Sequence, residues 1–326
     1  MGRPLKACLM ALAVAVRAVA AIGSPVLDDD ALARGFTDKL GRLVDAGGVI
    51  EAEAAKEQLS AAHGATATLP EAAEDRRIVP AGPLYDAVLP AVVAVGSVFK
   101  CDRCSRWHLG GLASGWIVSP DGLVVTNHHV LQRDAGHRFG VMTSDGEVYA
   151  VTSVVASDPE GDAAVLRIDG RGREFACLAI GDAPACGTPV SVISHPRGRF
   201  YCLTEGVVSR YHRQRRRDRD DGATAGPPAV WMSVTADYAV GSSGGPVFDG
   251  AGRVVGMVSR TATVLPRQRP AGPVDAESPP DSPHPQPPQP QPQPPPQMIF
   301  KDCVSAETLR AILGVDARGP APPPGS

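Results

Sequence analysis

The stretch Gly241-Ser242-Ser243-Gly244-Gly245-Pro246-Val247-Phe248-Asp249 sets a serine among glycines immediately before an apolar run. Glycine-rich turns are common, but a turn that holds a serine and leads into a strand-like segment is not the usual hairpin. From residue 90 onward the chain consists of short β-branched runs separated by turn signals such as Ser119-Pro120-Asp121-Gly122. The runs cover residues 91–98, 116–118, 123–126, 148–155, 164–168, 190–193, 207–209, 230–234 and 254–258. Many short strands with few helices predict an all-β barrel or sandwich.

Two other short segments carry side chains that suit catalysis. His129 stands at the end of the apolar segment 124–130, and Asp162 leads directly into the apolar segment 163–168. Taken alone, the histidine is explained as a structural residue and the aspartate as a turn residue. The order His129, Asp162, Ser243, with spacings of 33 and 81 residues (129 to 162 and 162 to 243), is much more specific as a set.

Residues 112–313 resemble the trypsin-like serine proteases, most closely the HtrA-type bacterial branch. The resemblance is carried by Ser114-Gly115-Trp116-Ile117-Val118, by Thr126-Asn127-His128-His129-Val130, by the segment 158–168 beginning Asp158-Pro159, and by residues 241–246. It implies an all-β fold of two six-stranded antiparallel β-barrels with the active site in the cleft between them. A helical N-terminal preface and a short C-terminal helix, residues 305–313, would accompany the barrels.

The resemblance also implies roles for the three residues. Ser243 would attack the peptide carbonyl, His129 would act as general base, and Asp162 would orient the imidazole. The backbone N–H groups of Gly241 and Ser243 would form the oxyanion hole. His128 is expected to point to the other face if its segment is strand-like. We therefore expect a serine endopeptidase acting on proteins or peptides through an acyl-enzyme, with no metal or cofactor.

Two positions depart from the patterns of related families. Ser242 stands where digestive trypsin-like enzymes have an aspartate that pairs with a new amino terminus, so that ion-pair activation switch is not expected. Asp237, six residues before Ser243, coincides with the acid that trypsin uses to bind arginine or lysine side chains. Asp237 is therefore a candidate substrate-binding residue, and the alternative is a solvated loop aspartate.

The remaining chain divides into segments with different expected roles. Residues 1–23 have the basic start, short apolar run and small residues of a signal peptide, which predicts a secreted or periplasmic protein without a stable membrane span. Residues 24–80 form a helical preface or pro-region, with helices expected over 28–44 and 51–62. Residues 81–314 form the protease domain, interrupted by a disordered Pro/Gln-rich insertion at 266–297. A disordered tail, 315–326, leaves no room for a PDZ module.

Composition and cysteine content leave other functions open. A net charge of -3 and a pI near 6.2 argue against a basic nucleic-acid binder, although the arginine-rich segment 210–219 could attract phosphates instead of forming a solvated loop. Six cysteines remain after residue 23, which permits disulfide bonds. Cys101 and Cys104, with His108 nearby, fit a disulfide best; a zinc site or free thiols are the alternatives.

A protease-like binding module with a blocked cleft is the alternative function. An interaction protein acting through the arginine segment or the Pro/Gln stretch 279–297 is another.

Overall fold

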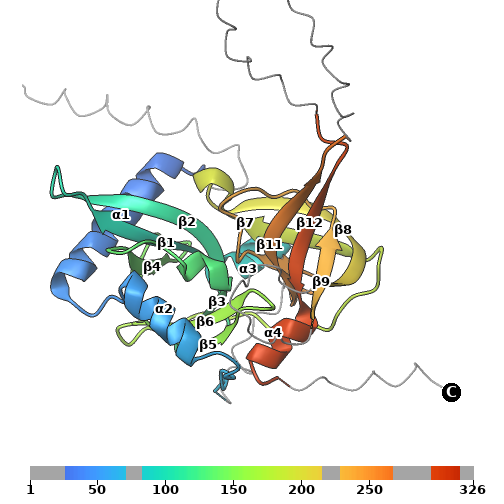
Figure 1. The fold of residues 1–326 in the computed structure, drawn as a ribbon, viewed down its shortest axis with the longest axis horizontal. Coiled ribbons are helices and arrows are strands. Elements are labelled where there is room, and N and C mark those ends of the chain that lie inside the picture. Colours follow the sequence, from blue (N-terminus) through green and yellow to red (C-terminus); the bar gives the residue numbers. More distant parts are fainter. Residues whose placement is uncertain (1–25, 71–82, 215–227, 267–294, 316–326) are drawn as a thin grey trace, which may run out of the picture.

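The computed structural model describes residues 26–70, 83–214, 228–266 and 295–315 of the chain (Figure 1). Its described part consists of two closed antiparallel β-barrels of six strands each. The predicted fold is therefore confirmed. The expected signal peptide, nearly all of the Pro/Gln-rich insertion and the tail from residue 316 lie outside the described residues.

The first barrel has the strand order β1-β2-β3-β6-β5-β4. Its strands are β1 (Val92–Lys100), β2 (Trp107–Ile117), β3 (Leu123–Thr126), β4 (Arg138–Met142), β5 (Val148–Asp158) and β6 (Ala163–Ile168). Closure leaves no free sheet edge, and side chains such as Trp116, Phe139 and Leu166 are fully buried. Strand β2 is much longer than the predicted 116–118, and β4 was not predicted, because its pairing with β1 and β5 is a tertiary contact.

The second barrel has the strand order β10-β11-β12-β9-β8-β7. Its strands are β7 (Pro189–Ser194), β8 (Cys202–Gln214), β9 (Ala229–Val234), β10 (Pro246–Phe248), β11 (Val254–Val264) and β12 (Met298–Ser305). The Pro/Gln-rich segment separates β11 from β12, yet the two strands pair from Gly256 opposite Ser305 to Val264 opposite Met298. The insertion therefore lies within the second barrel's sequence, and β12 is needed to close it.

Helices α1 and α2 pack on the first barrel, and α4 contacts strands of both barrels. The helices are α1 (Asp29–Ala46), α2 (Ala52–Ala61), α3 (Leu84–Val88) and α4 (Ala306–Ile312), with short 3-10 turns η2 (Leu89–Ala91), η3 (His128–Leu131) and η4 (Pro196–Gly198). Asp28 caps α1 by accepting a hydrogen bond from the Ala31 N–H (2.9 Å). Ser305 caps α4 by accepting a hydrogen bond from the Thr308 N–H (3.4 Å). Figure 1 shows α1 and α2 against the outside of the first barrel.

Helix α1 buries Phe36 and Leu40 completely against the first barrel. Small residues on the strands make room for them. A Cβ atom at Gly96 would lie 2.8 Å from the Phe36 ring, and one at Gly140 would lie 2.6 Å from Leu40. The preface thus shares the hydrophobic core of the first barrel instead of lying apart from it.

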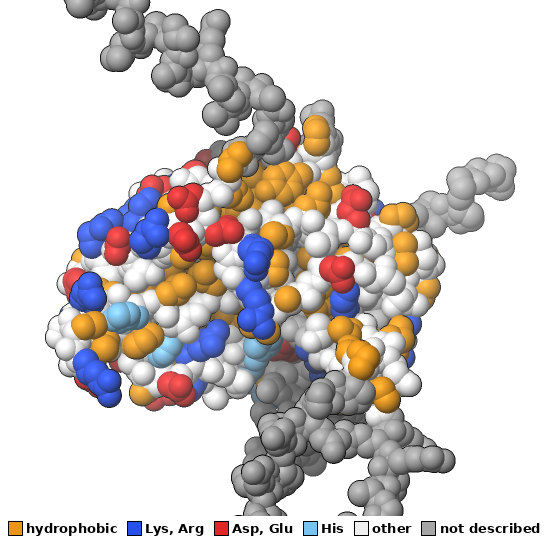
Figure 2. Space-filling view, turned by 90° about the horizontal axis from the view of Figure 1, so that it is seen from above, with side chains coloured by type: hydrophobic (Ala, Val, Ile, Leu, Met, Phe, Trp, Pro, Cys, Tyr) orange, Lys and Arg blue, Asp and Glu red, His pale blue; other side chains and the backbone are white. Residues whose placement is uncertain are grey.

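The surface carries no dominant charge on the face shown in Figure 2, where basic and acidic side chains are interspersed. This agrees with the small net charge of the chain. Among the described residues, no helix is both long and apolar enough to cross a membrane.

Candidate active site

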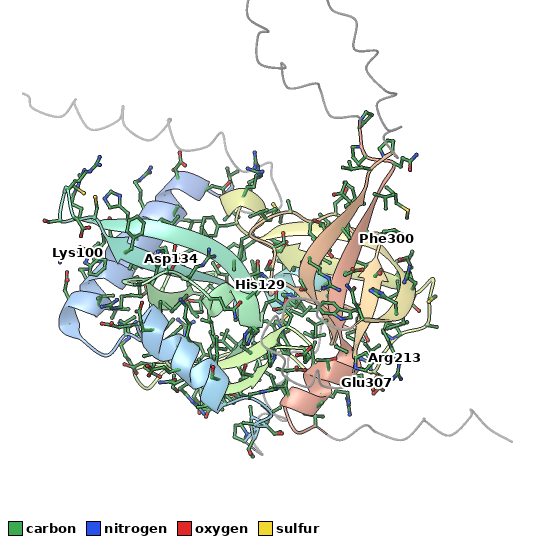
Figure 3. All side chains as sticks on the ribbon, viewed as in Figure 1. Lys100, His129, Asp134, Arg213, Phe300 and Glu307 are labelled. Carbon is green, nitrogen blue, oxygen red and sulfur yellow. The ribbon has the colours of Figure 1, made fainter. Side chains whose placement is uncertain are left out.

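His129 lies between the two barrels, in the 3-10 turn η3 that follows β3 (Figure 3). The turn orients two neighbouring histidines differently. The His129 ring faces Asp162, whereas His128 Nδ1 lies 2.9 Å from the Ser157 hydroxyl and His128 Nε2 lies 3.1 Å from the Gln132 amide. The segment is therefore helical and not strand-like at this point, but the two rings still have different partners.

Asp162 immediately precedes β6 and contacts His129 through both carboxylate oxygens. His129 Nδ1 lies 2.8 Å from Oδ2 and 3.0 Å from Oδ1, and the His129 backbone N–H donates to Oδ1 at 3.1 Å. The Asn127 side-chain amide donates to the Asp162 carbonyl oxygen (2.9 Å), which fixes the backbone. Asp162 adopts φ 55, a left-handed conformation uncommon outside glycine. Several contacts thus hold this carboxylate in an unfavourable backbone conformation, which is typical of functional sites.

The Asp162 carboxylate is ionised at neutral pH in spite of its burial. Burial alone raises the pKa of Asp162, but hydrogen bonds from His129 and Ser259 outweigh it and hold the pKa below its ordinary value. The charged carboxylate therefore favours the tautomer of His129 with its proton on the facing nitrogen, Nδ1. In that tautomer Nε2 carries no proton and can act as an acceptor.

Ser243 lies in the loop between β9 and β10 of the second barrel, and β2 of the first barrel holds that loop. The Ser114 N–H donates to the Ser243 carbonyl (2.7 Å), and the Ser114 hydroxyl donates to the Gly241 carbonyl (3.0 Å). Gly241 and Gly244 have φ of 97 and 86, which favour glycine. The two barrels are therefore joined directly at the serine loop.

Ser259 connects the serine to the aspartate. The Ser243 hydroxyl donates to the Ser259 carbonyl (3.2 Å), and the Ser259 hydroxyl donates to Asp162 Oδ2 (2.5 Å). Ser259 lies in β11 where the pairing with β12 shifts between Val258 and Arg260. Such an irregularity redirects a residue away from the regular ladder, here toward the site. The structure thus brings Ser243, Asp162 and His129 into one connected group.

The amides of Gly241 and Ser243 donate no hydrogen bond to any residue that the structure describes. The neighbouring loop amides are engaged: the Ser242 N–H donates to the Ala239 carbonyl and the Gly244 N–H to the Val258 carbonyl, both at 2.9 Å. The Ser242 side chain is buried and accepts a hydrogen bond from Ser194 (2.9 Å). The two unengaged amides are those predicted for the oxyanion hole.

Asp237 is exposed and forms an ion pair with Lys301 of β12. Its carbonyl accepts a hydrogen bond from the Thr204 hydroxyl (2.7 Å). The following residue, Tyr238, is partly buried and donates its hydroxyl to the carbonyls of Arg260 and Asp302, both at 3.0 Å. The carboxylate of Asp237 therefore has a cationic partner in the chain itself.

The structure forms no disulfide bond among the six cysteines that it describes, so the predicted disulfides are not confirmed. Cys101, Cys104 and His108 lie together instead, with Cys104 Sγ 2.9 Å from His108 Nε2. The hydrogen bond with His108 lowers the pKa of Cys104 to about 6. The cluster lies at the β1–β2 hairpin and takes no part in the group around Ser243.

Sequence reasoning missed three residues that support this group. Ser114 and Asn127 stand in segments that were recognised, but neither residue type predicts its partner across the fold. Ser259 directly follows the predicted strand 254–258. No local signal marks it, because its orientation depends on the register between β11 and β12.

Two six-stranded barrels with a His-Asp pair on one and a loop serine on the other are the arrangement of trypsin-like peptidases. Comparison with known proteins agrees: residues 113–257 match the family model of the trypsin-like peptidase domain. The resemblance noted in the sequence is therefore confirmed over this region.

Curated relatives match the same part of the chain. A probable periplasmic serine endoprotease, DegP-like, from Brucella suis is 36% identical over 146 residues, covering 44% of this chain and 26% of the relative. A protein of the same name from Pseudomonas savastanoi pv. phaseolicola is 36% identical over 155 residues, which cover 47% of this chain and 29% of the relative. One from Ectopseudomonas mendocina is 32% identical over 152 residues, covering 47% and 30%. The matched region spans less than a third of these relatives' length, so it supports a serine-type peptidase domain and not their whole architecture.

Proposed function

We propose that the chain is a serine endopeptidase that hydrolyses peptide bonds through an acyl-enzyme on Ser243. The observation that carries this proposal is the double role of Ser259, whose carbonyl binds the Ser243 hydroxyl while its hydroxyl binds Asp162. Asp162 in turn binds His129. The Ser243 hydroxyl donates to Ser259 and not to His129, so the proposed reaction requires the Ser243 side chain to rotate toward the imidazole.

In the proposed reaction His129 Nε2 takes the proton of Ser243 as the serine oxygen bonds to the substrate carbonyl carbon. The same nitrogen then returns that proton to the leaving amine, and the peptide C–N bond breaks. In the second half-reaction His129 Nε2 takes a proton from water as the water oxygen bonds to the acyl carbon. The same nitrogen returns that proton to Ser243 as the ester C–O bond breaks and the carboxylic acid product leaves. Asp162 keeps the imidazole in the required tautomer and stabilises its cation.

The negative charge on the substrate oxygen requires prearranged donors. We assign this role to the amides of Gly241 and Ser243, which donate to no other described residue. One such donor is worth about 3 kcal/mol of transition-state stabilisation.

Asp237 is our candidate for recognising a basic side chain at P1, the substrate residue before the cut. Its ion pair with Lys301 opposes that role, because a substrate cation must replace the ammonium group. We therefore expect only a weak preference for basic P1 residues. Asp237→Asn should remove this preference and Lys301→Met should strengthen it, whereas an unchanged cleavage profile in both variants would exclude Asp237.

Export is the remaining part of the proposal. It is supported by the apolar start of the chain and by relatives whose names call them periplasmic. N-terminal sequencing of the protein recovered from the extracytoplasmic fraction should find a start close to residue 24.

The main experiment compares the full chain with its Ser243→Ala variant. A fluorophosphonate should label the wild type at Ser243 and should not label the variant, and only the wild type should cut a peptide library. Cleavage that survives in Ser243→Ala would refute the mechanism. A folded wild type that is neither labelled nor active would instead favour the alternative of a protease-like binding module.

A further inference from the structure

A cluster of metal-binding side chains lies in the hairpin between β1 and β2, away from the proposed active site. It consists of the thiols of Cys101 and Cys104 and the imidazole of His108, whose donor atoms all lie within 4.8 Å of one another. In Figure 3, Lys100, the residue before Cys101, lies at the outer end of the first barrel, whereas His129 lies between the barrels. The cluster is therefore remote from Ser243 and has no role in the proposed reaction.

The backbone of the hairpin brings the two cysteines together. The Ser105 N–H donates to the Cys101 carbonyl (2.8 Å), and the Cys101 N–H donates to the Arg106 carbonyl (3.1 Å). Ser105 adopts φ 54, which turns the chain sharply directly after Cys104. This tight turn directs both thiols to the same region.

The pairing of β1 with β2 places the histidine beside the thiols. His108 lies opposite Phe99, and the two rings stack with centroids 5.7 Å apart and planes inclined by 28°. Stacking restricts the imidazole, and Cys104 Sγ lies 2.9 Å from its Nε2. His108 is therefore held on a paired strand, and both cysteines lie in the tight turn that joins β1 to β2.

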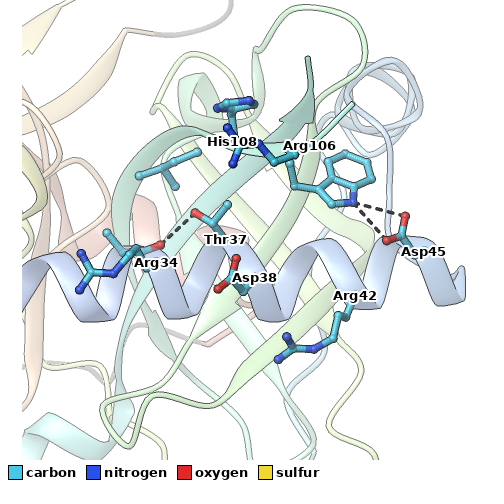
Figure 4. Close-up of a pocket in the computed structure, with 10 residues that line it drawn as sticks. Arg34, Thr37, Asp38, Arg42, Asp45, Arg106 and His108 are labelled. Carbon is cyan, nitrogen blue, oxygen red and sulfur yellow. Dashed lines mark hydrogen bonds between the residues drawn. The ribbon is translucent and has the colours of Figure 1, made fainter. Parts of the chain in front are cut away.

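Contacts with α1 hold the hairpin in place. Trp107 Nε1 lies 3.3 Å from both carboxylate oxygens of Asp45, and the Lys100 ammonium group lies 3.8 Å from the same carboxylate. Gly41 allows this approach, since a Cβ atom there would lie 2.5 Å from the Trp107 ring. Figure 4 shows the pocket between α1 and β2, of about 700 Å³, to which His108 also contributes. The pocket leaves solvent access beside the histidine.

We propose that Cys101, Cys104 and His108 bind one Zn²⁺ ion, with a water molecule as the fourth ligand. Two thiolates and one imidazole suit Zn²⁺, whereas Mg²⁺ and Ca²⁺ prefer oxygen ligands. Zn–S bonds of about 2.3 Å in a tetrahedral site put the sulfurs roughly 3.8 Å apart. That separation falls within the observed spread of the donor atoms. The described residues supply three donors, which is why we assign the fourth position to water.

Binding involves no oxidation or reduction. Each thiol loses its proton to solvent, its sulfur forms a bond to zinc, and neutral His108 contributes the lone pair of Nε2. A disulfide between Cys101 and Cys104 would consume the same sulfurs, so the oxidised protein cannot bind zinc in this way.

The test uses the full chain, reduced and freed of metal by a chelator, with Zn²⁺ followed by calorimetry and Co²⁺ followed by its visible spectrum. We expect one ion per chain and the spectrum of a tetrahedral thiolate site. Cys104→Ser and His108→Ala should weaken binding by more than the roughly 10–100-fold that loss of an outer-shell partner costs. The matched control is Cys186→Ser, which removes an exposed cysteine outside the cluster and should bind as the wild type does.

Three results would overturn the zinc site. They are absence of stoichiometric binding, equal affinity in Cys104→Ser and wild type, and recovery of the native protein with Cys101 and Cys104 joined in a disulfide. Thermal melting of each variant without metal checks that it is folded. The inference does not depend on the proposed peptidase activity, since Ser243→Ala should bind zinc with unchanged affinity.

Discussion

Gly244 gives a sharp test of how the serine loop is held between the barrels. It has φ +86, and a Cβ atom there would lie 2.0 Å from the Ser114 carbonyl oxygen and 2.4 Å from the Thr126 hydroxyl. Ser114 is the residue whose N–H binds the Ser243 carbonyl. The change Gly244→Ala therefore strains the backbone and drives the loop away from β2.

The size of the effect follows from two contributions. A left-handed conformation costs a non-glycine residue about 1–2 kcal/mol, and overpacking adds about 1–3 kcal/mol. To reach a normal contact distance the loop must move by about 1 Å, and a displacement of that size at a reacting group costs about 100-fold in rate. We expect Gly244→Ala to lose about 2–5 kcal/mol of unfolding free energy and about 100-fold in kcat.

The matched control is Gly146→Ala, in the turn between β4 and β5. Gly146 has a similar φ of +79, but no atom lies within 4 Å of the position of its Cβ. The control therefore carries the backbone strain alone, about 1–2 kcal/mol, and should leave kcat unchanged. Urea denaturation gives the stabilities and peptide hydrolysis gives kcat. Equal losses of unfolding free energy in the two variants, with kcat retained in Gly244→Ala, would refute the proposed close contact between the serine loop and β2.

Three further predictions concern other parts of the structure. Ser259→Ala removes a hydrogen bond to the Asp162 carboxylate and should lower kcat by about tenfold. The control Ser233→Ala breaks a comparable hydrogen bond to Asp302 (2.7 Å) and should leave kcat unchanged. Equal kcat values in both variants would contradict the role of Ser259. Burial lowers the pKa of His195 to about 4 from its ordinary 6.5. Between these two values the unfolded chain binds more protons than the folded chain, so the free energy of unfolding should fall by about 3 kcal/mol as the pH drops from 6.5 to 4. Equilibrium denaturation across that range should show a smaller loss in His195→Gln, and an identical pH dependence in both proteins would argue against the buried neutral imidazole. Phe36→Ala should cost about 3–5 kcal/mol because Phe36 is fully buried, and a loss below 1 kcal/mol would mean that α1 is not part of the folded core.

Local patterns let the sequence predict the barrels and single out His129, Asp162 and Ser243 as candidate catalytic residues. Short β-branched runs define most strands, and each of His129, Asp162 and Ser243 lies within a segment whose residues form a recognisable motif. Both N-terminal helices were also predicted within about two residues of their observed ends, since their apolar residues recur at helical spacing.

What escaped prediction depends on contacts between distant segments. The orientation of Ser259 follows from a register shift between β11 and β12, which a long insertion separates in the sequence. The Asp237–Lys301 pair requires the same closure of the second barrel. Packing of α1 on the barrel depends on Gly96 and Gly140. Their small size matters only because Phe36 and Leu40, which are distant in the sequence, pack against them. Residue types alone cannot reveal such pairings.

The central claim is that Ser243 and His129, held on different barrels, act as one catalytic unit. A double-mutant cycle on kcat with Ser243→Ala, His129→Ala and the combined variant tests it most directly. Residues that act as a unit give a double variant no slower than either single variant. If instead the two losses multiply, the serine and the histidine act independently and the proposed mechanism is wrong.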